Sequence, residues 1–170
     1  DPPPANPLRG AEIPALLDKA KALRAKDPRD LGRQITALGD PVSPRGPDLD
    51  FLVEYVLAEN SRPLRFLAID AAQRIDAAGA AAAFLKRAQS EKDPARAILA
   101  VEALGYTATK EHAAALVELV KHPSVLVATQ AADALARVGT SKEVDDLVSI
   151  GLAHADSHVT DHTAWAVQDL

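Results

Sequence analysis

The stretch Ala131-Ala132-Asp133-Ala134-Leu135-Ala136-Arg137-Val138-Gly139 contains the pattern that decides the fold. Its kernel is an Ala followed by an apolar residue, close to the end of a helical run. The same kernel recurs along the chain at five places: Ala37-Leu38, Ala71-Ala72, Ala103-Leu104, Ala134-Leu135 and Ala166-Val167. Successive kernels lie 34, 32, 31 and 32 residues apart. A near-constant period of this length is typical of stacked supersecondary units, so the sequence predicts a repeat array.

The composition favours closely packed helices and excludes several kinds of site. Of the 170 residues, 35 are Ala, the best helix former, while aromatic residues make up only 4%. The absence of Cys excludes disulfides and thiolate metal sites. A formal net charge of −5 gives no general attraction to nucleic acid, and no apolar run reaches the roughly 18 residues that a membrane span needs. We therefore expect no nucleic-acid partner, no membrane span and no cofactor.

Apolar residues recur at helical spacing in five successive helix pairs, which follow a Pro-rich extended segment at 1–10. No stretch alternates apolar and polar residues, so no sheet is expected. One pair is too small to bury its own apolar face, and neighbouring pairs must stack into one elongated core. This predicts an all-α solenoid, an α-α superhelix of about five antiparallel pairs: 11–39, 48–79, 80–105, 109–139 and 141–170.

Local signals indicate where several of these helices begin and end. Three prolines and one glycine at 40–47 preclude a helix there, and we expect a loop that bridges the first two pairs or contacts a partner. Asp48 is then a plausible N-cap of the next helix, and the second helix of that pair ends near Gly79. Thr140, followed three residues later by Glu143, has the spacing of a capping box.

Two segments, Asp27-Pro28…Ala37-Leu38-Gly39 and Asp93-Pro94…Ala103-Leu104-Gly105, resemble the second helix of HEAT repeats. They are more similar still to bacterial HEAT-like repeats of the type first associated with phycobilin lyases. Asp156…Ala164-Trp165-Ala166-Val167 resembles the Ala-Trp-Ala-Leu variant of that helix, and the resemblance extends over about residues 11–170. It implies a right-handed superhelix whose second helices line the concave side. It also leaves a lyase-like module as an alternative to a binding scaffold.

The residue before each kernel Ala defines a candidate partner-binding strip on the second helices. If the copies align, these positions form a ladder along the second helices. Its first member is Thr36, and Arg33 lies one turn before Thr36. We hypothesise that an acidic strip ending at an aromatic side chain accepts a basic or peptide partner. The residues concerned are Asp70, Glu102, Asp133, Trp165 and Arg33.

Other interpretations of this strip remain open. A solvated helix face would carry the same acidic residues, with local i,i+4 ion pairs Asp70–Arg74 and Asp133–Arg137. Trp165, the only Trp of the chain, is either a packing residue against a neighbouring repeat or a recognition anchor. The sequence therefore indicates where a partner would bind without deciding between a binding surface and an ordinary solvated face.

Three of the five histidines lie close together in the sequence, at His154, His158 and His162. His158 and His162 are one helical turn apart, a spacing that suits two imidazole ligands of one Zn²⁺ or Ni²⁺ ion. Asp161 is adjacent and completes the candidate metal set. The alternative is a row of solvated histidines, because the His-Glu-x-x-His pattern is not present.

The sequence contains no Gly-rich phosphate loop and no Gly-x-Ser-x-Gly motif. We therefore expect a non-catalytic scaffold that binds a protein or peptide, and the alternative is a regulatory module attached to an enzyme. The sequence begins without Met on a Pro-rich segment, which favours an exported, periplasmic protein over a cytoplasmic one. Its last helix is apolar, and this favours further repeats or a fused domain beyond Leu170.

Overall fold

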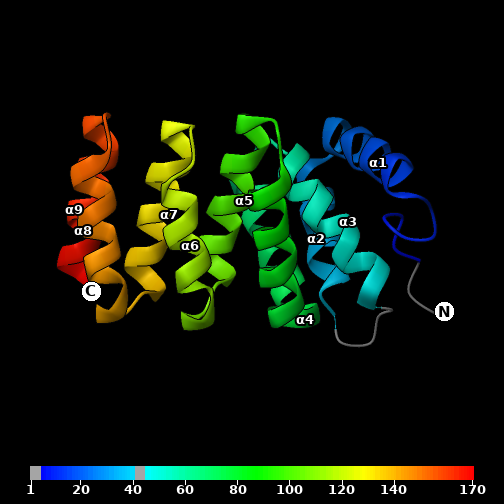
Figure 1. Cartoon of the computed structure of the whole chain (residues 1–170). Helices are drawn as coiled ribbons and strands as arrows, with labels where there is room; N and C mark the ends of the chain where they lie inside the picture. The colour runs from blue at the N-terminus through cyan, green and yellow to red at the C-terminus, as the bar shows by residue number, and fades with distance from the viewer. Residues whose placement is uncertain (1–4, 41–44) are drawn as a thin grey trace. The chain divides into compact units, whose positions relative to one another are not determined.

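The computed structural model describes residues 5–40 and 45–170, and these residues form helices and turns without a strand (Figure 1). The prediction of an all-α chain is confirmed. The α-helices are α1 (Ile13–Lys26), α2 (Pro28–Leu38), α3 (Arg45–Ala58), α4 (Arg62–Ser90), α5 (Pro94–Thr107), α6 (Ala113–Val120), α7 (Val125–Val138), α8 (Val144–Ala153) and α9 (Ser157–Asp169). Short 3-10 helices, Lys110–His112 and Ser141–Glu143, precede α6 and α8. Within the described ranges, no helix combines the length and apolar character that crossing a membrane requires.

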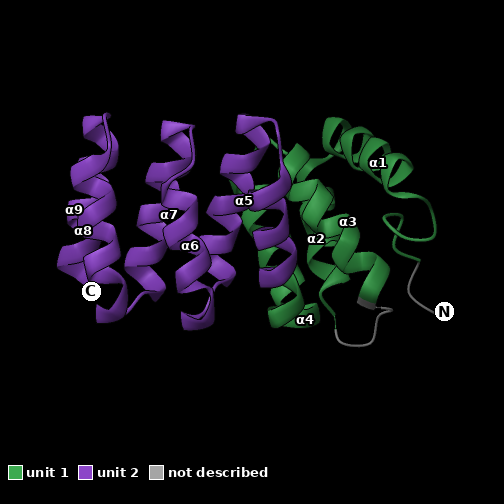
Figure 2. Cartoon of the chain, viewed as in Figure 1, with its two compact units in different colours: residues 1–80 green, residues 81–170 purple. Residues whose placement is uncertain are grey.

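The chain divides into two compact units, residues 1–80 and residues 81–170 (Figure 2). Unit 1 contains α1, α2, α3 and most of α4, and unit 2 contains the end of α4 together with α5 to α9. The division falls within α4, which also carries a break in its helical backbone at Asp76. Each unit consists of helices that pack against their neighbours along the chain, as a repeat array requires.

Unit 2 is a stack of helix pairs in two layers. The second helices α5, α7 and α9 pack side by side in one layer, while α6 packs on α7 and α8 packs on α9 (Figure 1). The kernel residues Ala103, Leu104, Ala134 and Leu135 are all fully buried. Small side chains at the Ala positions let neighbouring helices approach closely, and this is why the period of the kernel predicts the stack.

In unit 1, α1 packs against α2 and α3, and a buried carboxylate joins these elements to the start of α4. Glu59 accepts hydrogen bonds from Arg24 Nη1 at 2.5 Å, the Tyr55 hydroxyl at 2.7 Å and the Ser61 N–H at 2.6 Å. Burial and the hydrogen bond to Glu59 raise the pKa of Tyr55 well above its usual value. The Glu59 cluster therefore connects α1 to the turn between α3 and α4.

The end of the Pro-rich segment is attached to unit 1 in the described residues. Leu8 is fully buried, and Asn6 Nδ2 donates to the Gln34 carbonyl oxygen of α2 at 2.8 Å. Arg9 Nε lies 3.0 Å from Asp48 Oδ2 of α3. Residues 5–10 are thus held by α2 and α3, while residues 1–4 of the expected extended segment lie outside the described residues.

Helix α3 begins earlier than the Pro-rich and Gly-containing stretch at 40–47 indicates. It starts at Arg45, so the expectation of a loop is wrong for Gly46 and Pro47, and residues 41–44 lie outside the described part of the chain. Proline is tolerated in a first turn because its missing N–H needs no partner there. Asp48 is not an N-cap but a buried partner of Arg9. Burial raises the pKa of the Asp48 carboxyl, and the charge and hydrogen bond of Arg9 oppose that shift.

Helix α4 consists of two helical segments that meet at Asp76, whose φ of −160° and ψ of 100° are not helical. Asp76 Oδ1 accepts the N–H of Gly79 at 2.9 Å, as an N-cap does. The break therefore lies at Asp76 and not near Gly79, which belongs to the second segment. Because glycine has no side-chain acceptor for the unpaired N–H groups of a first turn, Asp76 determines where the helix restarts.

Two successive repeats open with the same capping arrangement. The predicted capping box is confirmed, since Glu143 Oε2 accepts the Thr140 N–H at 2.7 Å and the Thr140 hydroxyl at 2.9 Å. Burial acts to raise the pKa of Glu143, but these hydrogen bonds hold it below its usual value. In the preceding repeat, the Thr109 N–H donates to His112 Nδ1 at 3.1 Å. The two capping boxes lie at equivalent positions of successive repeats, just before α6 and α8.

Candidate functional site

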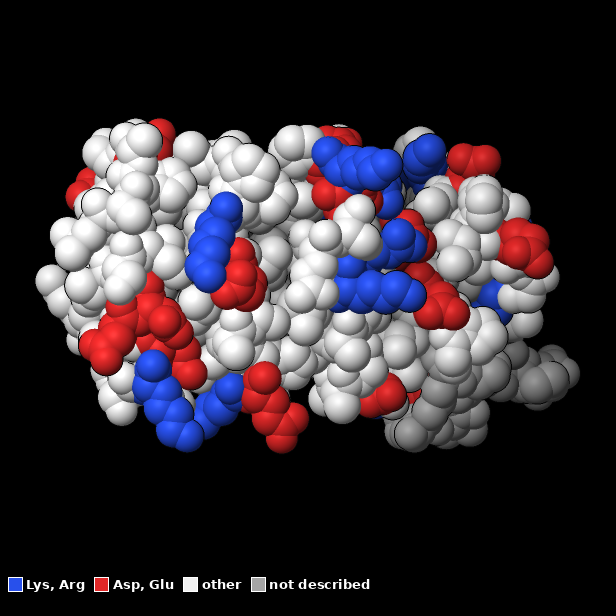
Figure 3. Space-filling model, viewed as in Figure 1, with Lys and Arg blue, Asp and Glu red and all other residues white. Residues whose placement is uncertain are grey.

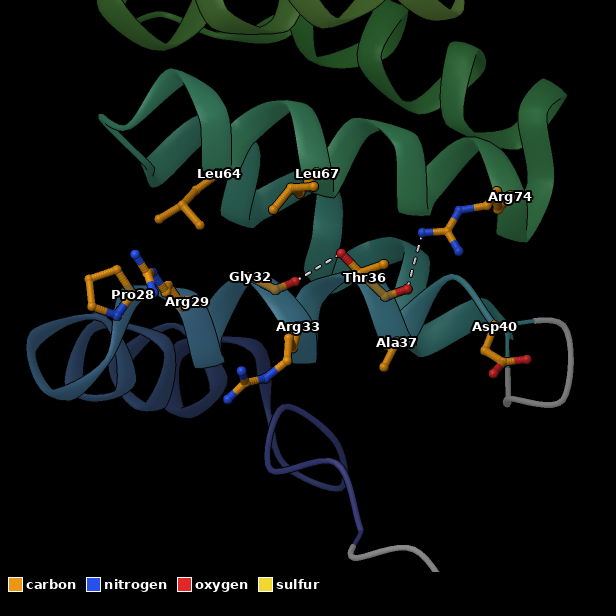
Figure 4. A pocket seen from close by; sticks show the side chains of 10 residues that line it. All are labelled: Pro28, Arg29, Gly32, Arg33, Thr36, Ala37, Asp40, Leu64, Leu67 and Arg74. Atoms are coloured by element: carbon orange, nitrogen blue, oxygen red, sulfur yellow. Dashed lines mark hydrogen bonds between the residues drawn. The ribbon is translucent and has the colours of Figure 1, made fainter.

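A groove of about 790 Å³ in unit 1 runs between α2 and the first segment of α4 (Figure 4). Leucine side chains of α4 point toward α2, and arginine side chains come from both helices. The groove combines an apolar floor with polar edges. Its lining residues are Pro28, Arg29, Gly32, Arg33, Thr36, Ala37, Asp40, Leu64, Leu67 and Arg74.

The start of α2 places the first part of the groove. Asp27 Oδ1 accepts the N–H of Arg29 at 2.9 Å and that of Asp30 at 3.2 Å, and Pro28 occupies the first turn of the helix. Arg29 and Arg33 follow one turn apart, so they lie on the same side of α2. Asp27, which caps the start of α2, thus also determines where Arg29 and Arg33 lie along the groove.

The apolar floor exists because Gly32 has no side chain. A Cβ atom at Gly32 would lie 3.2 Å from Leu67 Cδ1 and 3.9 Å from Leu64 Cδ2, so both leucines pack directly over the backbone of α2. Leu67 nevertheless keeps 37% of its surface exposed. An exposed leucine inside a groove is a surface on which an apolar side chain of another molecule can be buried.

Hydrogen bonds hold two of the groove arginines in place. Arg33 Nη2 lies 3.1 Å from Asp30 Oδ1, and Arg74 Nε lies 3.0 Å from Asp70 Oδ2. Arg74 Nη2 also donates to the Thr36 carbonyl oxygen at 3.1 Å, and this bond joins α4 to α2 (Figure 4). The groove therefore presents guanidinium groups in set positions, and such groups recognise carboxylates and carbonyl oxygens.

Two residues of the predicted partner-binding strip belong to this part of unit 1. Arg33 lines the groove itself, and Asp70 pairs with Arg74 at its edge. The expected i,i+4 pair between Asp70 and Arg74 is thereby confirmed. In unit 2, Glu102 is half-buried on α5.

The other two strip residues, Asp133 of α7 and Trp165 of α9, meet in unit 2. His162 Nδ1 lies 2.7 Å from Asp133 Oδ1, and the centroids of the His162 and Trp165 rings are 5.0 Å apart. Trp165 keeps 57% of its surface exposed. His162 therefore connects α7 to α9 and supports the indole ring from one side. A hollow of about 300 Å³ at this point is lined by Asp133, Ala136, Arg137, Trp165, Ala166 and Asp169.

The second expected i,i+4 pair, between Asp133 and Arg137, is replaced by contacts between repeats. Asp133 binds His162, as described above. Arg137 Nε donates to the Gly105 carbonyl oxygen at 3.2 Å, and its guanidinium carbon lies 5.3 Å from the centroid of the Tyr106 ring. Both side chains thus join α7 to a neighbouring second helix instead of pairing along α7.

The structure does not bring the predicted metal set together. His154 Nδ1 accepts the N–H of Asp156 within a turn at 3.1 Å, while His158 and Asp161 are exposed on α9. His162 turns toward α7, on which α9 stacks. Across residues 5–40 and 45–170, no group of three or more His, Cys, Asp and Glu side chains is placed to hold a metal ion. Stacking against α7, which the sequence spacing does not reveal, determines the direction of His162.

The groove residues Arg29, Leu64 and Leu67 are not among the partner-binding residues predicted from the sequence. One signal was nevertheless present, because Gly32 stands in the middle of α2, where glycine costs about 1 kcal/mol relative to alanine. A glycine kept inside a helix despite this cost often marks a close approach of another element. Here that element is Leu67 of α4.

Charged side chains of both signs are interspersed on the face of the molecule that Figure 3 shows. Red and blue side chains lie next to one another, and much of the visible surface of unit 2 is uncharged. A surface with interspersed positive and negative charges does not attract a partner through one extended electrostatic field, so specific contacts between residues would determine binding on this face.

Comparison with known proteins bears mainly on unit 2. A family model described as HEAT repeats matches residues 82–168, which is just over half of the chain. A search of curated proteins finds no match. The family match supports the HEAT-repeat part of the resemblance and does not extend to the phycobilin-lyase type.

Proposed function

This chain belongs to the HEAT-repeat family, and from that premise we propose that it is a non-catalytic scaffold that binds a protein partner. Stacked helical repeats present extended surfaces whose shape is set before a partner arrives. The observation that carries the proposal is the groove between α2 and α4, where an exposed leucine lies beside prearranged arginines.

The floor of the groove suits an apolar anchor of a partner segment. Leu64 and Leu67 pack over Gly32 and leave part of Leu67 exposed, so a partner side chain placed there would be removed from water. Binding energy in protein interfaces is concentrated in a few such anchors. A short helix or an extended segment of the partner, with one apolar residue seated over Leu67, fits this arrangement.

The arginines would orient that segment. Arg33 and Arg74 are already held by Asp30 and Asp70, so little side-chain freedom is lost when they meet a partner. Their remaining N–H groups can donate to carboxylates or backbone carbonyl oxygens. In unit 2, Trp165 offers a second contact of the type that dominates interfaces, an exposed indole supported by a neighbouring ring.

Affinity capture from the native host with matched variants tests this function. Leu67→Glu places a charge on the floor of the groove, whereas Leu126→Glu places the same charge at another exposed leucine, on α7. We expect one protein to be retained by the unmodified chain and by Leu126→Glu, and to be lost with Leu67→Glu. Titration calorimetry with that purified protein should show a Kd at least about tenfold higher for Leu67→Glu.

Identical captured proteins for all three chains, with equal Kd values, would contradict binding in the groove. If the captured protein is an enzyme whose turnover changes when the chain is added, the result would support the regulatory module considered from the sequence. Leu67 and Leu126 are both partly exposed, so neither substitution removes a fully buried side chain.

A further inference from the structure

Arg29 differs from the other two arginines that line the groove in unit 1. Arg33 Nη2 lies 3.1 Å from Asp30 Oδ1, and Arg74 Nε lies 3.0 Å from Asp70 Oδ2. The Arg29 side chain, in contrast, is exposed and forms no hydrogen bond or ion pair with any part of the chain that the structure describes. Its charge is therefore available to another molecule.

The carboxylates next to Arg29 on α2 are already engaged by other groups. Asp27 Oδ1 accepts the backbone N–H groups of Arg29 and Asp30, and Asp30 Oδ1 pairs with Arg33. Neither carboxylate forms an ion pair with the Arg29 guanidinium. Pairing Arg29 with a carboxylate of another molecule therefore breaks no contact within the described chain.

Arg29 lies close to the apolar floor of the groove. It precedes Gly32 by three residues, so the two lie on one side of α2 with a rise of about 4.5 Å between them. Leu67 covers Gly32, since a Cβ atom at Gly32 would lie 3.2 Å from Leu67 Cδ1. Figure 4 shows Arg29 at the end of the groove where Leu64 lies, and Arg74 at the opposite end. An apolar side chain seated over Leu67 therefore has the unpaired guanidinium on one side of it.

A long polyanion does not fit this arrangement of charges. The carboxylates of Asp30 and Asp70 lie beside Arg33 and Arg74, so a chain of phosphates along the groove would meet negative charge at both pairs. The exposed part of Leu67 offers such a chain no favourable contact. A single carboxylate that reaches Arg29 meets neither difficulty, and guanidinium groups bind carboxylates through two parallel N–H···O bonds.

We propose that the groove binds an acidic segment of a protein partner, in which a Glu or Asp pairs with Arg29 and an apolar residue two positions away lies over Leu67. This inference rests on the proposed function and specifies the chemistry of the partner. In an extended segment, alternate side chains point to the same side about 6.6 Å apart. The long side chains of Arg29 and of the acidic residue span the difference between this spacing and the turn that separates Arg29 from Gly32.

The two contacts affect binding in different ways. Burial of the apolar residue over Leu67 supplies affinity, whereas the ion pair with Arg29 selects an acidic residue and sets the direction of the segment. Asp70 of the predicted acidic strip is engaged by Arg74, so it does not offer a free carboxylate to a basic partner here. The groove therefore favours a partner charge opposite to the one expected for the strip.

Selection of displayed peptides tests the proposal, because a random library contains acidic and basic residues at every position. A library of linear peptides is selected on the purified, immobilised chain, and peptides that Leu67→Glu also retains are discarded as binding outside the groove. We expect the remaining peptides to carry Asp or Glu two positions from a large apolar residue. Selection on Arg29→Glu should enrich Lys or Arg at that position instead.

A charge reversal outside the groove is the matched control. Lys19 of α1 is exposed and does not line the groove, and Lys19→Glu changes the net charge by the same amount as Arg29→Glu. For one selected acidic peptide with a fluorescent label, anisotropy titration should give a Kd at least about tenfold higher for Arg29→Glu and an unchanged Kd for Lys19→Glu. Replacing the acidic residue of the peptide by Lys should restore binding to Arg29→Glu, as a direct pair requires.

The outcomes separate this inference from the proposed function. Peptides that depend on Leu67, but carry no acidic residue and bind Arg29→Glu with an equal Kd, would overturn the acidic preference and leave the groove as a binding site. Basic residues enriched by the unmodified chain would overturn it in favour of the partner expected for the strip. If every selected peptide also binds Leu67→Glu, binding in the groove fails, and the inference fails with it.

Discussion

Asp48 is a capping residue by its position in the sequence and an ion-pair partner by its position in the structure. It follows a Pro-rich stretch, as N-caps often do, but α3 begins at Arg45 and buries Asp48 against Arg9. The two residues are 39 positions apart in the sequence, and no local pattern encodes a contact over this separation. Burial in this contact raises the pKa of the Asp48 carboxyl, with Arg9 opposing the shift.

This raised pKa predicts a pH dependence of stability. Because the pKa of Asp48 is higher in the folded than in the unfolded chain, its contribution to the free energy of unfolding is fully present below the ordinary Asp pKa and is lost as the pH rises through the folded value. We expect the free energy of unfolding of Asp48→Asn to increase relative to that of the unmodified chain between about pH 3 and about pH 7. Urea unfolding at a series of pH values measures the difference.

The control for this prediction is Asp50→Asn, at an exposed aspartate two residues further along α3. The same series of urea unfolding measurements on this variant gives the effect of removing an exposed carboxylate from α3. A difference that moves in the opposite direction for Asp48→Asn would contradict the assignment of burial as the dominant effect on the Asp48 carboxyl.

At the scale of elements, the glycine after the kernel has a function that its sequence position only partly reveals. Gly39 ends α2, in agreement with a helix stop signal. Its φ of −77° is accessible to any residue, so backbone conformation does not require glycine there. The requirement comes from α4, since a Cβ atom at Gly39 would lie 2.8 Å from Ala71 Cα and 3.0 Å from the Ala71 carbonyl oxygen.

Gly39→Ala should therefore force α2 and α4 apart. We expect a loss of about 1–3 kcal/mol in the free energy of unfolding, the usual cost of overpacking against backbone. Gly46→Ala in α3 is the matched control, because a Cβ atom there meets nothing within 4 Å. That variant should be unchanged or more stable by up to about 1 kcal/mol. Equal urea midpoints for the two variants would show that α2 and α4 do not depend on this close approach.

At the scale of the whole molecule, stacked repeats are stabilised by contacts between neighbours, so damage to one pair should remain local. Leu147 of α8 is fully buried, and Leu147→Ala should cost about 2–5 kcal/mol in its own pair. We expect amide hydrogen exchange, followed by mass spectrometry, to become faster in α8 and α9 while α1 and α2 keep their rates. An equal increase in α1 and α2 would indicate that the chain unfolds as one block.

Much of the fold could be predicted from the sequence because it depends on short-range spacing. The 31- to 34-residue period of the kernels, the helical spacing of apolar residues and the absence of strand patterns predict an all-α stack of pairs. The capping box at Thr140 and the pair between Asp70 and Arg74 were also predictable, since their members lie within one helical turn of each other. These contacts depend on residues close in sequence, although the equally local pair between Asp133 and Arg137 is replaced by contacts between repeats.

The tertiary structure decided which of these helical faces meet. The predicted strip contained Arg33, Asp133 and Trp165, but not the leucines that form the groove floor. His162, assigned from its spacing to a metal site, instead binds Asp133, 29 residues earlier. Such contacts join rigid helices whose separation and rotation follow from the packing of many buried side chains together. For this reason the sequence determined the repeats of this protein, while only the packing of its helices decided the groove.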